Sequence, residues 1–236
     1  MKLHRVLLLA SLIHAAAFAQ ATDAPAAGQG GPAPKLCALT FDDGPDAAKT
    51  ALVLDKLEKH GVTASFFVIG QKIDDMTAPV LKRAVSLGCE IDNHSWSYNS
   101  LNFAGEDIIK NSIAKTTEAI RKYAGVAPSF FRPPNLAVSL KLFNAAGLPA
   151  AGGVVGNDWD QSTTAESRAR TVLMGMRDGA IILLHDVQPD PHPTPEALDI
   201  LIPELKAQGY EFVTLAELFK RKGVEPKAGK LWQYVE

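Results

Sequence analysis

The sequence predicts an α/β fold in which parallel strands alternate with helices. Short apolar runs of strand length, such as LCALTF (36–41), are separated by longer segments whose apolar residues recur at helical spacing. Gly or Pro follows most of these segments and marks their ends. Strands that alternate with helices of this length form parallel βαβ units. About seven or eight such units can close into a barrel or form a doubly wound sheet.

The first half of the body contains five predicted elements. They are a strand at 36–41 that ends at DDGPD, a helix at 47–60 that ends at Gly61, a strand at 63–70, a helix at 78–88 and a strand at 89–94. No GxGxxG or GxxxxGK[ST] motif follows the first strand, which disfavours a nucleotide-binding sheet.

The alternation continues through the second half. The predicted elements are a helix at 105–124, a strand at 129–134 cut off by prolines, a helix at 139–147, a strand at 149–155, a helix at 164–178, a strand at 179–186, a helix at 194–209, and a strand with a short helix at 210–219. No internal repeat is visible.

The N-terminus has the features of an export signal. Lys2 and Arg5 supply a basic start, an apolar run follows, and AFA (17–19) supplies the small-x-small cleavage pattern. A membrane anchor is the rival interpretation, but the run is short and His14 interrupts it. We therefore expect residues 1–19 to be a signal peptide and the protein to be exported (secreted or periplasmic). After removal of the signal, we expect no membrane span.

The composition of the remaining chain separates a leader from a folded body. Residues 20–35 are rich in Ala, Gly and Pro and form a predicted flexible leader, so residues 36–236 form the predicted folded domain. The net charge of -2 gives no support to nucleic acid as a partner. Nothing in the sequence suggests an obligate oligomer, and a monomer is expected.

Two cysteines, Cys37 and Cys89, follow the predicted signal. An exported protein can pair them in a disulfide. Both also lie in apolar strand-like segments, where a free cysteine packs as a small hydrophobic residue. The sequence leaves the two alternatives about equal.

Polar residues cluster directly after the predicted strands. The cluster comprises Asp42, Asp43, His94, Arg132, Asp158 and His185. Carboxyl ends of parallel strands meet at one edge, where α/β proteins hold their ligands. Each residue also has an ordinary structural explanation, such as a turn for Asp42-Asp43 or a core position for Trp159. Their joint occurrence at successive strand ends favours one site.

These residue types suit metal-assisted hydrolysis. One carboxylate of the Asp42–Asp43 pair can bind a metal while the other acts as a base. An arginine at a strand end can fix a carboxylate, and a histidine such as His185 can protonate a leaving group.

Five motifs carry a resemblance to a known family. They are TFDDGP (40–45), NHSWSY (93–98), RPPN (132–135), DW (158–159) and LLH (183–185). They resemble the motifs of the polysaccharide deacetylases of the NodB-homology type, carbohydrate esterase family four. In order and spacing they span residues 36–219, nearly the whole body.

The resemblance implies a distorted (β/α) barrel with about seven parallel strands and a divalent metal, commonly zinc, with cobalt as an alternative. It implies removal of acetyl groups from an acetylated glycan such as chitin oligomers, peptidoglycan or xylan. The implied roles are Asp42 as base, metal-bound water as nucleophile, His185 as acid, Arg132 and Asp158 as their partners, Asp43 and His94 as metal ligands, and Asn135, Trp159 and Leu183 as substrate-binding residues.

Two positions depart from the family pattern. Tyr98 stands where the second motif has its final histidine, and Asn135 stands where the third motif has tyrosine. Tyr98 can bind metal as a phenolate, leave its place to water, or mark a site that has lost its metal. We expect His60 to stabilise a helix end and His192 to be a solvated loop residue, so neither replaces the missing ligand.

The leading hypothesis is an exported metal-dependent carbohydrate deacetylase. The alternatives are a carbohydrate-binding protein that kept the barrel but lost its chemistry, and an amidase that acts on a non-sugar amide. The presence of Asp42, Arg132, Asp158 and His185 favours the enzyme, whereas Tyr98 favours the binding protein.

Overall fold

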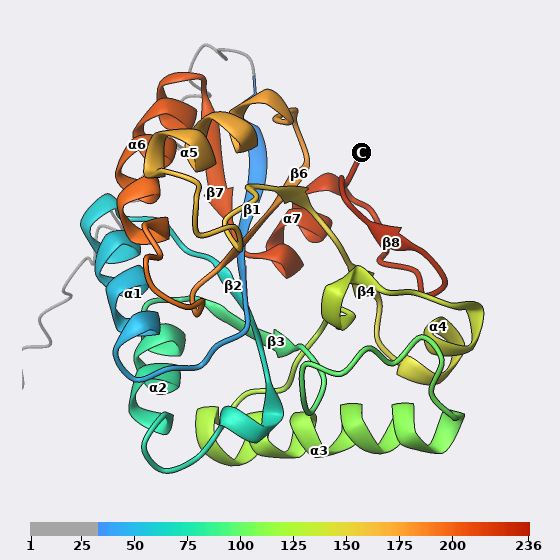
Figure 1. The fold of residues 1–236 in the computed structure, drawn as a ribbon. Helices are drawn as coiled ribbons and strands as arrows, with labels where there is room; N and C mark the ends of the chain where they lie inside the picture. Colours follow the sequence, from blue (N-terminus) through green and yellow to red (C-terminus); the bar gives the residue numbers. More distant parts are fainter. Residues whose placement is uncertain (1–32) are drawn as a thin grey trace, which may run out of the picture. The chain divides into compact units, whose positions relative to one another are not determined.

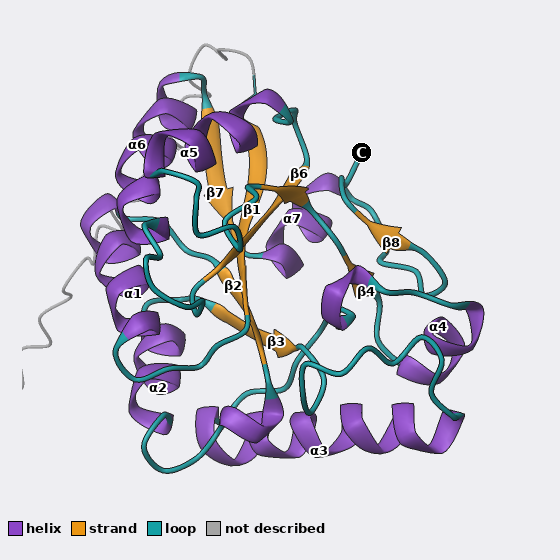
Figure 2. Cartoon of the chain, in the orientation of Figure 1, coloured by secondary structure: helices purple, strands orange, loops and turns teal. Residues whose placement is uncertain are grey.

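The computed structural model describes residues 33–236, and the predicted signal peptide lies outside them. A parallel sheet runs through the centre (Figures 1 and 2). Its strands are β1 (Lys35–Asp42), β2 (Ser65–Val68), β3 (Glu90–Asn93), β5 (Val154–Val155), β6 (Ala180–His185) and β7 (Tyr210–Val213). They follow the order β3-β2-β1-β6-β5, and β7 pairs with the first half of β1. This architecture confirms the predicted α/β fold with parallel strands.

The barrel is distorted because part of its wall is irregular. Only Phe131 of the predicted strand 129–134 bridges its neighbours, Asn93 on one side and Ala150 on the other. Prolines 133 and 134 have no N–H to donate, and they end the strand there. The predicted strand 149–155 is split by Gly152 and Gly153 into β4 (Ala150–Ala151) and β5.

Seven α-helices lie around these strands in the described residues. They are α1 (Lys49–His60), α2 (Ala78–Ser86), α3 (Glu106–Ala124), α4 (Leu140–Ala146), α5 (Ala165–Met174), α6 (Thr194–Ala207) and α7 (Leu215–Lys222). Two single turns, η1 (Gly70–Lys72) and η2 (Pro134–Leu136), follow β2 and Phe131. Helix α6 contacts both α1 and α5, whereas α3 contacts α2 and α4 (Figure 1).

The side chains of β1 divide between two cores. Cys37, Leu39 and Phe41 belong to the large cluster that includes α1, α2 and α6. Leu36 and Ala38 point to the opposite face and join a second cluster. Because side chains alternate along a strand, Asp42 continues this second face. The buried apolar residues of β1 therefore position the Asp42 carboxylate at the edge of the sheet.

The C-terminal segment completes the barrel wall. β8 (Leu231–Trp232), which the sequence analysis did not predict, pairs with β4. The backbone N–H of Val235 donates to the carbonyl oxygen of Gly179, which has a φ of +85°. A Cβ on Gly179 would lie 2.0 Å from the carbonyl oxygen of Val235, so only glycine allows this approach.

The structure decides between the two alternatives that the sequence left open for the cysteines. Cys37 and Cys89 are free and buried, so the structure contains no disulfide between them. Burial raises the pKa of Cys37 to about 12 and that of Cys89 to about 11. Within residues 33–236, no helix is both long and apolar enough to cross a bilayer.

Candidate active site

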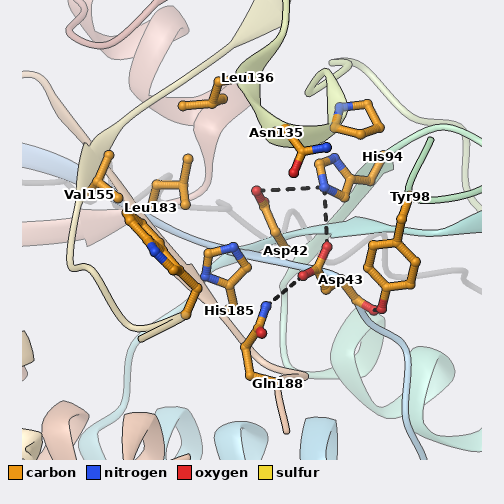
Figure 3. A pocket seen from close by; sticks show the side chains of 12 residues that line it. Asp42, Asp43, His94, Tyr98, Asn135, Leu136, Val155, Leu183, His185 and Gln188 are labelled. Carbon is orange, nitrogen blue, oxygen red and sulfur yellow. Dashed lines mark hydrogen bonds and ion pairs between the residues drawn. The ribbon is translucent and has the colours of Figure 1, made fainter. Parts of the chain in front are cut away.

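A pocket of about 440 Å³ opens at the carboxyl edge of the central strands (Figure 3). It is lined by Asp42, Asp43, His94, Tyr98, Pro134, Asn135, Leu136, Val155, Trp159, Leu183, His185 and Gln188. Eight of the ten predicted site residues line it, and the other two, Arg132 and Asp158, contact residues that do. Segments far apart in the sequence therefore meet at one edge.

Arg132 holds the carboxylate of Asp42. Its Nη1 donates to Asp42 Oδ1 at 2.5 Å, and both side chains are buried. The remaining donors bind the carbonyl oxygens of Ala151 and Gly152, and the guanidinium lies over the ring of Phe67. Since each guanidinium nitrogen of Arg132 has an acceptor in the protein, Asp42 Oδ1 is fixed while Oδ2 faces the pocket (Figure 3).

Asp158 holds His185 in the same manner. Its Oδ1 lies 2.7 Å from His185 Nδ1, and its Oδ2 accepts from the backbone N–H of His185. Burial opposes the imidazolium, but the hydrogen bond to Asp158 and its charge outweigh burial and raise the pKa of His185 to about 9. Nδ1 carries the proton that Asp158 accepts, so Nε2 is the atom available to the pocket.

Asp42 and His185 lie at the same level of neighbouring strands. They are register partners across the β1–β6 pair. Register partners in a sheet point to the same face. The two side chains therefore project into the pocket together, as Figure 3 shows.

Asp43 and His94 form a second pair on the other side of Asp42. His94 Nδ1 lies 2.8 Å from the carbonyl oxygen of Arg132, an acceptor, so Nδ1 carries the proton. The lone pair of Nε2 then faces Asp43 Oδ1 at 3.4 Å. Burial raises the pKa of the Asp43 carboxyl, but the interaction with His94 and the positive charges of His185 and Lys72 outweigh burial and hold that pKa below its ordinary value.

This pair fits one divalent cation. Two ligand atoms ~2.1 Å from one ion in tetrahedral geometry lie ~3.4 Å apart, which matches the Asp43–His94 spacing. Among residues 33–236, no group of three or more His, Cys, Asp or Glu side chains is arranged around a metal position. The chain thus offers one carboxylate and one imidazole.

Tyr98 lies beside Asp43 but is not an ionised ligand. Its hydroxyl is 3.4 Å from the Asp43 carbonyl oxygen, and the side chain is about half exposed. Burial of the phenol and the charges of Asp43 and Asp186 raise the pKa of Tyr98 above its ordinary value. The phenol is therefore neutral at pH 7, which disfavours the phenolate alternative unless a cation lowers its pKa.

The remaining predicted residues form the rim. Trp159 is 49% exposed and meets the His185 ring edge-on, with 6.1 Å between ring centroids. Leu183 is buried two residues before His185, on the same face. Asn135 has a φ of +57° within η2, and its side chain donates to Ser100.

Two residues near the site were missed by sequence reasoning. Gln188 lines the pocket and donates to Asp43 Oδ2 at 2.7 Å. His192 was expected to be a solvated loop residue, and this expectation was wrong. It is half-buried, and its Nε2 lies 2.9 Å from the carbonyl oxygen of His185. Two histidines seven residues apart across a Pro-rich loop were the available signal.

Comparison with known proteins identifies relatives of the chain. The polysaccharide deacetylase family model matches residues 29–151. A bifunctional xylanase/deacetylase from Pseudobutyrivibrio xylanivorans is 45% identical over 86% of this chain and 33% of its own length. The peptidoglycan-N-acetylglucosamine deacetylase PgdA of Listeria monocytogenes is 37% identical over 80% of this chain and 40% of its own length. The chain thus spans two fifths or less of these curated relatives.

A solved structure covers nearly the same extent as this chain. It is a family 4 acetyl xylan esterase from Clostridium thermocellum in complex with a cobalt ion. The match has a TM-score of 0.84 and 58% identity, and it covers 85% of this chain and 99% of the other.

Proposed function

Since this chain belongs to the polysaccharide deacetylase family, we propose that it is a metal-dependent hydrolase that removes acetyl groups from a carbohydrate. The observation that carries the proposal is the pairing of two oriented proton-transfer groups, Asp42 held by Arg132 and His185 held by Asp158, on one pocket. Hydrolysis of an acetyl group needs a base for water and an acid for the leaving group.

Asp42 is the proposed base. Its free oxygen, Oδ2, lies 3.8 Å from His94 Nε2, close to the position that the Asp43–His94 pair would share with a cation. A water molecule there is within reach of the carboxylate. Arg132 keeps the Asp42 side chain directed at that water throughout the reaction.

His185 is the proposed acid. A pKa of about 9 keeps its ring protonated at neutral pH, so Nε2 carries a proton for the departing sugar oxygen or nitrogen. This proton is essential for an amine and helpful for an alkoxide, because both leave poorly when unprotonated. Asp158 stabilises the imidazolium until the proton is transferred.

Asp43 and His94 are the proposed metal ligands, with zinc or cobalt as the ion. A divalent cation held there acidifies water and polarises the acetyl carbonyl. Gln188 fixes the second oxygen of Asp43, so the carboxylate presents a single oxygen to the ion. Water or substrate would complete the coordination, since the Tyr98 hydroxyl donates to the backbone carbonyl oxygen of Asp43.

The rim residues suit an acetyl group on a sugar. Leu183 and Trp159 provide an apolar wall beside His185 for the acetyl methyl, and the half-exposed Trp159 ring can stack on a sugar face. We assign the backbone N–H of Asn135 to the oxyanion. Its left-handed conformation turns the peptide relative to a normal strand, at the wall of the pocket.

The proposed substrate is an acetylated glycan, with acetylated xylan as the first polymer to test. Two of the relatives described above are named for xylan, and the third is named for peptidoglycan. The predicted signal at residues 1–19 would place the enzyme outside the cytoplasm, where such polymers occur.

The test is acetate release from acetylated xylan, peptidoglycan and N-acetylglucosamine oligomers, together with metal analysis of the purified protein. We expect about one bound divalent ion, and Asp42→Asn should lower kcat by ~10²–10⁴-fold. Asp43→Ala should lose both the ion and activity. Glu118→Gln, on the exposed face of α3, is the matched control and should retain both.

Two results would contradict the proposed deacetylase function. A wild-type protein that binds no zinc or cobalt and releases no acetate from any polymer, while still binding the glycan, is a carbohydrate-binding protein. Activity on simple amides without activity on any glycan would indicate the amidase alternative.

A further inference from the structure

Three buried or half-buried side chains lie behind the His185–Asp158 pair and have no part in the reaction described above. Arg168 belongs to α5, Thr194 is the first residue of α6, and His192 lies in the loop between β6 and α6. Arg168 is 1% exposed and Thr194 is fully buried. Helices α5 and α6 lie against each other (Figure 1), which brings the three side chains together.

Thr194 joins Arg168 to Asp158. Arg168 Nη1 donates to Thr194 Oγ1 at 2.9 Å, and Thr194 Oγ1 donates to Asp158 Oδ2 at 2.8 Å. A guanidinium only donates and an ionised carboxylate only accepts, so the threonine hydroxyl has one possible direction. Thr194 thereby helps to fix Asp158 through Oδ2, the oxygen that also accepts from the backbone N–H of His185.

His192 joins Arg168 to His185. Arg168 Nη1 lies 3.1 Å from His192 Nδ1, and His192 Nε2 lies 2.9 Å from the His185 carbonyl oxygen. Because arginine has no acceptor, Nδ1 accepts and Nε2 carries the proton. Burial, with the positive charge of Arg168 adding to it, lowers the pKa of His192, which favours this neutral form.

Arg168 also fixes the loop that carries Asp158 and Trp159. Its Nε donates to Thr163 Oγ1 at 2.9 Å, and its Nη2 donates to the Asp160 carbonyl oxygen at 3.2 Å. Burying a guanidinium is costly unless its N–H groups have partners. These hydrogen bonds from Arg168 go either to residues that contact the His185–Asp158 pair or to the loop that carries Asp158.

We propose that Arg168, His192 and Thr194 are positioning residues that hold the His185–Asp158 acid in place for proton transfer to the leaving group. A general acid acts only when its proton lies within hydrogen-bond reach of the departing atom, and small displacements are costly. The inference rests on the proposed function, in which His185 is the acid.

The kinetic test compares two leaving groups. An acetylated glycan needs a proton on its leaving atom, whereas 4-nitrophenyl acetate releases a stable phenolate without one. We expect Thr194→Val to lower the ratio of glycan to aryl-acetate kcat by about tenfold or more, a fraction of the ~10²–10⁴-fold that general acid catalysis contributes. KM for the glycan should be unchanged.

Conservative and matched variants separate positioning from folding. Thr194→Ser keeps the hydroxyl and should restore the ratio. Thr171→Val makes the same change on α5, where the hydroxyl bonds only within its helix, and should leave the ratio at the wild-type value. An equal loss on both substrates in Thr194→Val, or no loss at all, would overturn the inference.

Nuclear magnetic resonance tests the arrangement independently of activity. In the ¹⁵N-histidine-labelled protein, assigned with His192→Gln, His192 should be neutral and protonated on Nε2 at pH 7. A His192 that is cationic or protonated on Nδ1 would contradict the arrangement. A wild-type protein inactive on both substrates would refute the proposed function, and the His192 signals would still decide whether these residues hold the pair.

Discussion

At the level of single residues, the site consists of two proton-transfer groups, each oriented by a charged partner. Arg132 fixes Asp42, and Asp158 fixes His185. The partners differ in charge because the groups have different tasks. The Arg132 cation fixes the orientation of the Asp42 carboxylate, which suits a base, and the Asp158 anion keeps His185 protonated, which suits an acid.

The first prediction concerns the pH dependence of deacetylation. The pKa of His185 is raised to about 9, so its acid form is present below that pH and is lost as pH rises through it. Activity on a glycan should therefore fall above pH ~9. In Asp158→Asn, burial is no longer opposed by the carboxylate charge, and the fall in activity at high pH should begin at least about one pH unit lower. Profiles of kcat against pH check both expectations. If the fall begins at the same pH in Asp158→Asn, it does not arise from His185.

The second prediction concerns the third ligand position. Tyr98→His replaces a neutral phenol with an imidazole lone pair, and zinc affinity should rise by about tenfold or more. Tyr98→Phe should leave the affinity unchanged, because the Tyr98 hydroxyl donates to the backbone carbonyl oxygen of Asp43. Calorimetric titration of metal-free protein with zinc measures both. Weaker binding by Tyr98→Phe would instead identify the phenol as a ligand.

Sequence reasoning located the strand-end residues but not their supports. Asp42 and His185 follow apolar runs directly, so their place at the sheet edge could be predicted from the chain. Gln188, His192 and Arg168 lie on loops or on a helix face. Their contacts depend on how α5, α6 and the loop after β6 pack together, which no local pattern encodes.

At the level of elements, β3 contains a buried carboxyl. Asp92 Oδ1 accepts from the backbone N–H groups of Ser129 and Phe130, whereas Oδ2 has no hydrogen-bond partner among the described residues. Burial and the neighbouring Glu90 raise the pKa of Asp92 well above its ordinary value. This strand therefore carries a group that resists ionisation.

The third prediction follows from the sign of that shift. At pH values between the pKa of Asp92 in the unfolded chain and its higher pKa in the folded protein, folding takes up a proton. The group therefore favours the folded state at low pH, and this contribution is lost as the pH rises through the folded pKa. Asp92→Asn cannot ionise and should be more stable than the wild type at pH 8, by ~1–3 kcal/mol. Urea denaturation from pH 4 to pH 8 should show the difference vanish at acidic pH.

The exposed Asp75→Asn is the control and should show no such trend. A destabilisation by Asp92→Asn that is constant across this pH range would mean that Asp92 is ionised in the folded protein.

Elements were predictable where a long local pattern marked them. The apolar run of β6 and the amphipathic α3 lie where the sequence placed them, within a few residues. The predicted strand 129–134 is reduced to a single bridge at Phe131. The prolines after it have no backbone N–H to donate to a neighbouring strand, so the pairing cannot continue. β8 was missed because two residues carry no periodicity.

At the level of the whole molecule, Arg132 connects separate parts of the barrel. Its guanidinium contacts Asp42 on β1, Phe67 on β2 and the carbonyl oxygens of Ala151 and Gly152 at the end of β4. The same side chain therefore serves the reaction and the closure of the wall.

The fourth prediction separates these two roles. Arg132→Met leaves Asp42 buried without its cation and should lower the free energy of unfolding by ~3–5 kcal/mol, as well as abolish activity. Asp42→Asn combined with Arg132→Met should lose less than the sum of the single changes, because the uncompensated charge is gone. Urea denaturation of the four proteins measures the coupling. Additive losses would mean that the ion pair contributes nothing to the fold.

The pairing of β8 with β4 has a practical consequence for protein engineering. The last strand of the wall is supplied by the final residues of the chain, and Trp232 and Val235 belong to the same core as Leu36 and Ile181. A chain cut before Pro226 leaves the edge of β4 open and this core uncovered. A synthetic peptide with the sequence of residues 226–236 has the complementary edge and side chains. The fold thus offers a natural division point for a split-protein reporter, in which reassembly restores the barrel.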